Sequence, residues 1–398
     1  MSLPAGPLTE AGLREHVWPR FSRTLMRPGV YLANHSLGRP LDRMGEDLAE
    51  FAATWYQRMD EVWSVWQREQ TRFTAGIERL VGAAPGTVTQ RASAGQALRS
   101  VLNSFPVDRA IRVVTTDAEF DSLDFILRAY EGAGRAAVEW VESCRSGEVP
   151  LVDTSRVLER VRAGVDLVVV SLVTFGTGQV LSGVAELTGA CRRAGALLLL
   201  DVYHAAGALP LDLAGLGVDF AVGGSYKYTR GGPGAAWLYV SPEVVGTGRA
   251  TLDTGWFAKA ETFDYRRGEA ISRQAGIGGW AESTPPVVAT YQARSGLEFT
   301  LEVGVDRLRA YSLERQARLR EALRSAGVPV FEPSEPLGYG AFSLVPCEGA
   351  KAVCERAAAR GLTVDSRGQF IRLCPDVLNS AEEFEEAARV LRSCLGGT

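Results

Sequence analysis

Five short segments of this chain are apolar at almost every position, and amphipathic helical patterns separate them. The apolar segments are Ile111–Thr116, Leu167–Val173, Ala196–Asp201, Asp219–Gly223 and Ala235–Val240. The helical patterns cover Ser122–Gly132, Thr154–Ala163 and Gly183–Ala194. Because successive side chains of a strand point to opposite faces, a wholly apolar strand is buried on both sides. These segments predict an α/β fold with a mainly parallel sheet covered by helices.

The pattern changes near Gly296, where a long helical stretch over Leu297–Ser325 begins. Short strand patterns and a final helix at Ala381–Leu395 follow it, which is typical of a smaller α+β domain. The N-terminal helices carry several tryptophans and favour a cover or a subunit contact. We therefore expect an N-terminal cover at 1–60, a large domain at 61–290 and a small C-terminal domain at 291–398.

Composition excludes several classes of protein. The chain has 398 residues, is 46% hydrophobic and 23% charged, and carries a formal net charge of −4. No basic cluster indicates a nucleic-acid partner. The segment Met1–Pro7 lacks the basic and apolar regions of a signal peptide, and no apolar run approaches the roughly 18 residues that span a membrane. We expect a cytoplasmic protein with no membrane or nucleic-acid partner.

The cysteines and histidines do not indicate a metal site. The six cysteines are Cys144, Cys191, Cys347, Cys354, Cys374 and Cys394, and only three histidines accompany them. A zinc site needs such ligands in clustered spacing, and there is no Cys-x-x-Cys pair. We expect reduced thiols and no metal.

Lys227 has an unusual setting for a lysine. It follows an apolar strand, stands between two tyrosines, and runs into the glycine-rich turn Gly231–Gly234. Glycines allow backbone or ligand to approach closely. Loss of solvation lowers the pKa of an amine and makes it nucleophilic, as a Schiff-base lysine requires. The alternative is a lysine that merely flanks a strand end.

Polar residues end several of the predicted strands. Asp201 ends one strand, Ser171 and Thr174 close another, and Thr116 ends a third. In an open parallel sheet, ligands bind outside these strand ends. A carboxylate and Lys227 at one edge form either a structural ion pair or the two ends of a site for a heteroaromatic cofactor.

Pyridoxal phosphate needs that arrangement. A lysine holds its aldehyde, a carboxylate keeps its pyridine nitrogen protonated, and an aromatic side chain stacks on the ring. Phe120 is the candidate for stacking, with a core phenylalanine as the alternative. The small-residue turn at Ala92–Gln96 opens a helix and suits a phosphate, although such turns also cap helices without any ligand.

At these residues the chain resembles kynureninases, which belong to the class V aminotransferase branch of fold-type I pyridoxal-phosphate enzymes. The matching segments are Asp201-Val-Tyr-His204, Ser225-Tyr-Lys-Tyr228 with Gly231-Gly-Pro-Gly234, Tyr31-Leu-Ala-Asn-His-Ser-Leu-Gly38, Gly255-Trp-Phe257, Ser283-Thr-Pro-Pro286 and Phe370-Ile-Arg-Leu373. The resemblance extends over most of the chain. It implies the fold-type I fold, pyridoxal phosphate as cofactor, and a homodimer with active sites near the subunit interface.

Carried over residue by residue, the resemblance implies three catalytic residues. Lys227 would bind the cofactor covalently and shuttle the Cα proton, Asp201 would pair with the pyridine nitrogen, and Tyr226 would contact the phosphate. The other residues implied at the cofactor are His204, Phe120, Ser93, Ala94, Gly95, Ser171, Trp256 and Thr284. The last two would complete the phosphate site, from the partner subunit. Plain packing for Trp256 and a strand-end hydroxyl for Ser171 remain the alternatives.

The resemblance also implies that Arg372 binds the substrate carboxylate, which a planar guanidinium does well. We place Asn34, His35 and Trp63 in the substrate pocket, with helix packing as the alternative for Trp63. The partner in this interpretation is a small-molecule amino-acid substrate.

Several departures from the family pattern fall around the substrate. His35 stands where the family has asparagine, and Leu123 aligns with an aspartate that approaches the cofactor, with Asp124 one place on. Lys259 replaces a histidine, and Thr174-Phe-Gly176 replaces an Asn-Tyr stretch. Together they indicate the family's cofactor site with an altered substrate pocket.

The leading hypothesis is therefore an enzyme that removes the Cα proton of an amino acid and cleaves at Cβ, with a substrate that need not be kynurenine. The alternatives are a C–S β-lyase acting on a cysteine S-conjugate in specialised metabolism and a class V aminotransferase. From a different class, the chain could be a catalytically silent relative of the fold, but the lysine and the aspartate are both retained.

Overall fold

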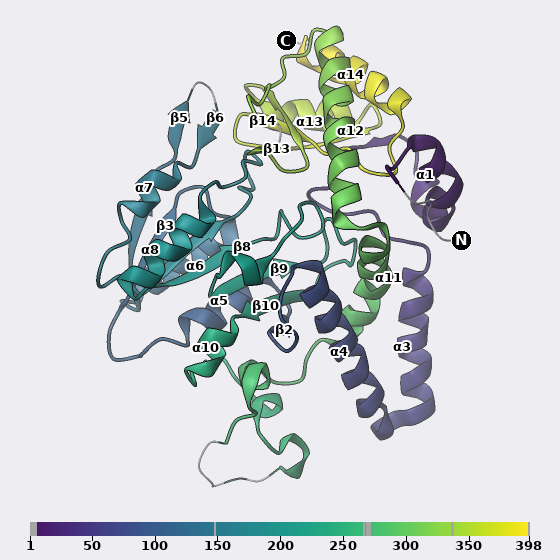
Figure 1. The fold of residues 1–398 in the computed structure, drawn as a ribbon. Coiled ribbons are helices and arrows are strands. Elements are labelled where there is room, and N and C mark those ends of the chain that lie inside the picture. The colour runs from purple at the N-terminus through teal and green to yellow at the C-terminus, as the bar shows by residue number, and fades with distance from the viewer. Residues whose placement is uncertain (1–5, 147–148, 266, 268–271, 336–337, 397–398) are drawn as a thin grey trace.

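A seven-stranded sheet forms the centre of the molecule (Figure 1). The computed structural model describes residues 6–146, 149–265, 267, 272–335 and 338–396. Residues 1–5, which belong to the segment without a signal-peptide pattern, lie outside these ranges. In order across the sheet the strands are β2 (Val88–Arg91), β10 (Ala236–Val240), β9 (Phe220–Gly224), β8 (Leu197–Asp201), β7 (Leu167–Ser171), β3 (Ile111–Thr116) and β4 (Ala136–Val141). β10 is antiparallel to both neighbours and every other adjacent pair is parallel, which confirms the predicted mainly parallel sheet.

The central strands are apolar throughout because helices cover both faces of the sheet. In β7, Val168 and Val170 pack into the core on one face, and Leu167 and Val169 pack into the core on the other. This alternation follows from the two-residue period of a strand. The helices on the first face are α4 (Trp63–Leu80), α7 (Thr154–Leu158), α8 (Val184–Ala194), α9 (Leu213–Leu216) and α11 (Val287–Val303). Those on the second face are α5 (Ala94–Leu102), α6 (Asp121–Gly132) and α10 (Pro242–Gly246).

The C-terminal part of the chain forms a smaller α+β unit at one end of the molecule (Figure 1). Its antiparallel sheet has the order β11 (Ser343–Pro346), β14 (Phe370–Leu373) and β13 (Asp365–Arg367). Its helices are α12 (Val305–Ser325), α13 (Ala350–Ala358) and α14 (Ala381–Leu395). The predicted helical stretch over Leu297–Ser325 is divided at Gly304, whose φ of +88° ends α11 and lets α12 start in a new direction.

The N-terminal segment connects the two parts of the molecule. It contains α1 (Glu10–His16), η1 (Trp18–Phe21), α2 (Ser22–Leu25), β1 (Val30–Tyr31), α3 (Met44–Arg58) and η2 (Met59–Val62). β1 pairs in parallel with β12 (Leu362–Thr363) of the C-terminal unit, while α3 packs on α11 beside α4. The chain between β1 and α3 therefore crosses the boundary between the large sheet and the C-terminal unit.

A region made mainly of loops extends away from the large sheet (Figure 1, green). It includes η3 (Trp256–Ala258), η4 (Thr262–Asp264) and η5 (Gly276–Trp280). A separate hairpin of β5 (Cys144–Ser146) and β6 (Val149–Leu151) lies elsewhere on the molecule. Among the described residues, no helix is long and apolar enough to cross a membrane.

Candidate active site

Neighbouring strands of the large sheet bring the predicted polar residues to one edge. Asp201 and Ser171 are register partners at the ends of β8 and β7, and Thr116 ends β3. Lys227 lies in the turn that follows β9. Because these strands are parallel, their carboxyl ends meet, which is where ligands bind in sheets of this kind.

The amine of Lys227 is buried among aromatic rings. Its side chain belongs to a residue that is only 5% exposed, and Nζ lies 2.5 Å from His204 Nε2. The ring centroids of Tyr203 and Phe120 lie 5.2 and 5.6 Å from Nζ. Rings on several sides and one imidazole nitrogen give Lys227 a fixed position, unlike a lysine on a solvated surface.

Burial changes the protonation of this amine. Loss of solvation lowers the pKa of Lys227 to about 7, against the opposing attraction of Asp201, and the charge of Arg372 lowers it further. An amine with such a pKa is partly unprotonated at neutral pH and can act as a nucleophile or accept a proton.

Asp201 is the buried carboxylate that faces this amine. Its Oδ1 accepts a 2.8 Å hydrogen bond from the backbone N–H of Tyr203, which is the only hydrogen bond of the carboxylate within the described part of the chain. Burial raises the pKa of Asp201 to about 6, whereas the Tyr203 hydrogen bond and Lys227 lower it. Gly224 makes room for this arrangement, because a Cβ there would come within 1.9 Å of the Tyr203 hydroxyl.

His204 is neutral in this setting. It is fully buried, and burial followed by the charge of Lys227 lowers the pKa of His204 well below its ordinary value. Its Nδ1 is buried without a partner, while Nε2 faces the lysine. One ring nitrogen is thus available to a further group beside Lys227.

Aromatic side chains form the walls around the amine. Phe120 is the N-cap residue of α6, and its ring packs edge-on against Phe175 at a centroid distance of 5.5 Å. Tyr226 packs against Tyr203 at 5.0 Å. The structure therefore brings together Lys227 and four of the residues predicted with it, namely Asp201, His204, Phe120 and Tyr226.

The sequence interpretation missed a second carboxyl group at this edge, that of Glu119. Its Oε1 accepts a 2.7 Å hydrogen bond from Thr116 and its Oε2 a 2.6 Å hydrogen bond from Ser171. Burial raises the pKa of Glu119 to about 7, the two hydroxyl groups lower it, and the charge of Asp201 raises it. Glu119 stands directly before Phe120 in the sequence, and this position beside the predicted stacking residue was the signal that could have identified it. Ser171 is thus held by Glu119.

The predicted phosphate turn lies at the N-terminus of α5. Ser93 caps the helix by accepting a 3.1 Å hydrogen bond from Gln96 N. Gln96 Oε1 accepts a 2.6 Å hydrogen bond from Ala92 N, and its Nε2 donates to Glu282. The helix packs against β9 and β10, which flank the Lys227 turn. The free N–H groups at the start of a helix form an anion site, so Ser93, Ala94 and Gly95 remain phosphate candidates.

Trp256, Thr284 and Trp63 lie together in the structure. Trp256 Nε1 donates a 3.1 Å hydrogen bond to Thr284, and the Trp63 ring lies 6.0 Å from the Trp256 ring. Thr284 also lines a cavity together with Ala92 and Gln96 of the predicted phosphate turn. In a single chain the two tryptophans belong to an aromatic cluster made of Phe51, Trp55, Trp63, Trp66, Trp256, Phe257, Phe263, Tyr265 and Tyr291.

Arg372 is held by a carboxylate that sequence reading did not identify. Its Nε and Nη2 donate to the two oxygens of Asp365 at 2.8 and 2.7 Å, and Nη1 donates to the carbonyl of Phe175. Although burial acts to raise it, the hydrogen bonds of His35 and Arg372 hold the pKa of Asp365 far below its usual range. Arg372 itself is 2% exposed.

The two remaining substrate candidates occupy the crossing segment beside Arg372. His35 Nε2 lies 2.8 Å from Asp365 Oδ1, and burial lowers the pKa of His35 to about 4, so this neutral imidazole donates to the carboxylate. Asn34 Nδ2 donates a 2.8 Å hydrogen bond to the carbonyl of Cys374, and its Oδ1 is buried without a partner. The imidazole of His35 thus supports Asp365 rather than standing free for a substrate.

Comparison with known proteins identifies the family. The model of the family "Aminotransferase class-V" matches residues 41–346, more than half of the chain. The chain belongs to the class-V aminotransferase family. A kynureninase of Koribacter versatilis is 28% identical over 372 residues, which cover 88% of this chain and 85% of that relative. A kynureninase of Myxococcus xanthus is 30% identical over 299 residues, which cover 72% of this chain and 70% of that relative.

A solved structure shares the fold of this class-V chain. The structure of the cystine C–S lyase C-DES with its reaction product cysteine persulfide has a TM-score of 0.82 at 18% identity, and it covers 93% of this chain and 98% of that one. The predicted fold-type I architecture and the predicted likeness to kynureninases within the class-V branch are both confirmed.

Membership in the class-V family confirms the predicted cofactor, pyridoxal phosphate. The residues fit this group on the geometry alone. Lys227 offers a buried amine of lowered pKa, and Phe120 offers a ring 5.6 Å from that amine. Asp201 offers a buried carboxylate whose one hydrogen bond, within the described part of the chain, comes from a backbone N–H. A protonated pyridine nitrogen is the cation that a carboxylate in this position would stabilise.

Proposed function

We propose that this class-V chain is a kynureninase-like enzyme that removes the Cα proton of an amino-acid substrate and cleaves a bond at Cβ. We further propose that its substrate is not kynurenine but an amino acid with a different group at Cβ. One observation carries the reaction: Lys227 Nζ, with a pKa lowered to about 7, lies in the same buried cluster as Asp201 and is influenced by Arg372.

The identity of the reactive amine has independent support. The chain has three lysines, Lys227, Lys259 and Lys351, and Lys227 is the buried one. Pyridoxal phosphate, when bound, supplies an aldehyde for a lysine and an electron sink for charge at Cα. In this proposal Lys227 Nζ accepts the Cα proton, and Asp201 holds the proton of the pyridine nitrogen. Phe120 orients the ring by stacking.

Arg372 is the proposed partner of the substrate carboxylate. Asp365 occupies its Nε and Nη2 edge, so the substrate meets Nη1, which now donates to the Phe175 carbonyl. A planar guanidinium serves two acceptors along two edges at once. Binding of substrate therefore exchanges the Phe175 contact for a carboxylate and leaves the Asp365 pair intact.

The change of substrate is inferred from the residues around this pair. Leu123 is fully buried in the apolar core under α6, so no carboxylate reaches the cofactor from that position. Glu119, the residue before Phe120, brings a carboxyl group to the end of β7 through its hydrogen bond with Ser171, and His35 is committed to Asp365. A pocket with different polar groups fits a different side chain.

A C–S β-lyase acting on a cysteine S-conjugate is the second candidate. The buried Leu123 favours it, because expulsion of a thiolate from Cβ needs no water on a γ-carbonyl, whereas hydrolysis of a kynurenine does. Transamination would end with a keto acid and an aminated cofactor. One carbanion at Cα serves all three reactions, and the pocket decides between them.

A homodimer is part of the proposal. The resemblance to kynureninases supports it, because that resemblance implies that Trp256 and Thr284 complete the phosphate site from the partner subunit. Size-exclusion chromatography with light scattering tests this assembly, and a monomeric active holoenzyme would contradict it.

The deciding experiment is product identification. Purified holoenzyme is incubated separately with L-kynurenine and with S-benzyl-L-cysteine, and products are identified by mass spectrometry. The proposed reaction class predicts cleavage at Cβ, with the benzyl thiol and pyruvate from the conjugate if the second candidate holds. A keto acid that retains the whole side chain would instead establish transamination, and anthranilate as the dominant product would show that kynurenine is the substrate.

A further inference from the structure

Lys227 and Arg372 come from different parts of the fold. Lys227 follows β9 of the large sheet, and Arg372 lies on β14 of the C-terminal unit. Under the proposed function, one takes the Cα proton and the other holds the carboxylate of the same small molecule. Their separation must therefore be set by contacts between the two units, because neither sheet alone fixes it.

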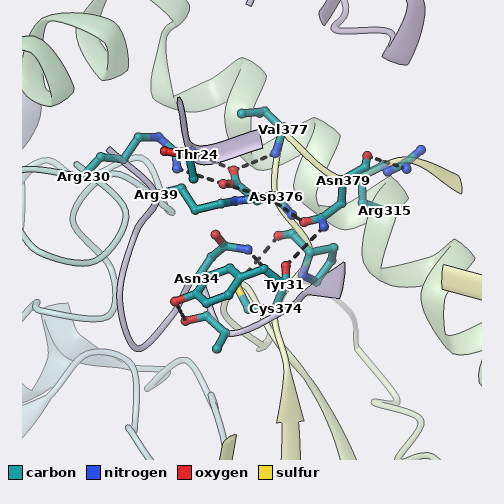
Figure 2. A network of polar contacts seen from close by, with 12 residues as sticks. Thr24, Tyr31, Asn34, Arg39, Arg230, Arg315, Cys374, Asp376, Val377 and Asn379 are labelled. Carbon is teal, nitrogen blue, oxygen red and sulfur yellow. Dashed lines mark hydrogen bonds and ion pairs between the residues drawn. The ribbon is translucent and has the colours of Figure 1, made fainter. Parts of the chain in front are cut away.

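A second arginine and a second carboxylate follow these two residues closely along the chain. Arg230 Nη1 and Nη2 donate to the two oxygens of Asp376 at 2.8 and 2.6 Å (Figure 2). Both side chains are buried, at 6% and 7% exposure. Arg230 is three residues after Lys227, and its backbone N–H donates to the Lys227 carbonyl at 3.1 Å. Asp376 is four residues after Arg372.

The surroundings hold each end of this pair. Arg230 has a φ of +58°, a left-handed conformation that a residue other than glycine keeps only where its neighbours impose it. Although burial raises it, Arg230 and then Arg39 hold the pKa of Asp376 below its ordinary range. Asp376 N donates to Asn379 Oδ1 at 3.0 Å, and Asp376 Oδ1 accepts from Val377 N at 2.6 Å.

The crossing N-terminal segment closes the same junction. Gly38 N donates to the Tyr226 carbonyl at 2.8 Å, and a Cβ on Gly38 would lie 1.9 Å from the Lys227 carbonyl oxygen. Next to it, Arg39 Nη2 lies 3.6 Å from Asp376 Oδ2 and donates to Asn379 at 2.9 Å (Figure 2). Asp376 thus has one arginine from the Lys227 turn and another from the crossing segment.

We infer that the Arg230–Asp376 pair is a positioning latch that sets the distance between the Lys227 amine and the Arg372 guanidinium. This inference rests on the proposed function. The pair is bidentate, which fixes orientation as well as distance, and a buried pair is screened much less than a pair on the surface. A cavity of about 50 Å³, lined by residues that include Lys227, Arg230 and Asp376, gives the turn room to shift when the latch is removed.

The consequence concerns the proton-transfer step. Without the latch, Arg372 still binds a carboxylate, but Cα lies at the wrong distance from Lys227 Nζ. A misplacement of about 1 Å can cost roughly 10²-fold in rate. We therefore expect loss of rate at Cα with little loss of binding. An ion pair that merely stabilises the fold would not separate these two quantities.

The test measures Cα proton exchange, because that step does not depend on the leaving group. Wild-type holoenzyme, Arg230→Gln and Arg230→Lys are incubated in D₂O with L-alanine, L-kynurenine and S-benzyl-L-cysteine, and loss of the Cα proton is followed by NMR. Exchange is expected to fall by roughly 10- to 100-fold in Arg230→Gln and by less in Arg230→Lys, which keeps the charge. The apparent affinity for each amino acid should change by less than about 3-fold, because Arg372 still binds the substrate carboxylate in these variants.

Arg39→Gln is the matched control, because it removes the other arginine of Asp376 and leaves the Lys227 turn untouched. Thermal unfolding is measured for all variants, and the visible band of bound cofactor reports a correctly folded site. If Arg230→Gln and Arg39→Gln lower the unfolding temperature alike while both exchange protons at the wild-type rate, the latch is wrong and the proposed function stands. If wild-type holoenzyme exchanges the Cα proton of none of the three amino acids, both proposals fall. Should Arg230→Gln not fold, Asp376→Asn, which keeps the size of the side chain, takes its place with the same expected separation.

Discussion

Arg372 of β14 meets Asp365 of the neighbouring strand β13 through two parallel hydrogen bonds of 2.8 and 2.7 Å. His35 donates to the same carboxylate. The guanidinium is therefore oriented before any substrate arrives, and orientation in advance reduces the entropy lost on binding. The part of its donor array outside this pair is the Nη1 edge, which donates to the Phe175 carbonyl.

Removal of the guanidinium should weaken substrate binding. We expect Arg372→Ala to reduce affinity by about 1.5–3 kcal/mol, the usual value of one charge-assisted pair. Equilibrium binding of the amino acid identified by product analysis measures this change. The control is Arg367→Ala, since Arg367 is exposed on β13, donates to the neighbouring Ser366 carbonyl and lies 4.0 Å from Asp365. Equal affinities in Arg372→Ala and wild type would exclude Arg372 from the carboxylate site.

Lys227 should be the residue that binds the cofactor covalently. Wild-type protein with pyridoxal phosphate is expected to show the visible absorption band of the lysine-bound cofactor, and Lys227→Ala should lose it. Lys351→Ala serves as the matched control, because Lys351 is exposed on α13. A band that survives in Lys227→Ala, or that never forms in the wild type, would contradict the assignment.

Asp201 should be needed for turnover more than for retention of the cofactor. Asp201→Ala removes the carboxylate at the pyridine nitrogen but leaves Lys227 in place, so some cofactor should remain bound while turnover is lost. Ultrafiltration quantifies the retained cofactor and a steady-state assay measures turnover. Near-normal turnover in this variant would be incompatible with the proposed mechanism.

Glu119 should make the stability of the cofactor-free protein depend on pH. Its pKa is raised from 4.5 to about 7, so the folded state binds more protons than the unfolded state between these values. Stability from this group is therefore present below about pH 4.5 and is lost as the pH rises towards 7.

The size of the effect follows from the shift. Wild type should lose about 3 kcal/mol more than Glu119→Gln in free energy of unfolding between about pH 4.5 and 7. Urea unfolding at several pH values measures it. Parallel pH profiles for the two proteins would show that Glu119 is not titrating in this range. Asp201 contributes to both profiles in the same sense, because burial also raises its pKa, to about 6.

Much of this site was visible in the sequence because its chemistry lies in local motifs. The apolar run before Asp201 predicted a buried parallel strand, and the rule that ligands bind beyond strand ends placed Asp201 near Lys227. The apolar strand β3 was predicted with the bounds that the structure has, Ile111–Thr116. The edge strands β2 and β4 were missed. A strand at the edge of a sheet has a neighbouring strand on one side only, so it carries polar residues and lacks a continuous apolar signal.

By itself the sequence determined the mainly parallel sheet and pointed to Lys227 and Asp201 at its edge, since strand burial and short motifs are written in neighbouring residues. Only the tertiary structure decided which distant residues meet. It placed Glu119 beneath Ser171, tied His35 and Arg372 to the same Asp365, and paired Arg230 with Asp376 across 146 positions of the chain. Such pairs depend on how the C-terminal unit and the crossing segment pack against the sheet, and no local pattern encodes a contact between residues so far apart.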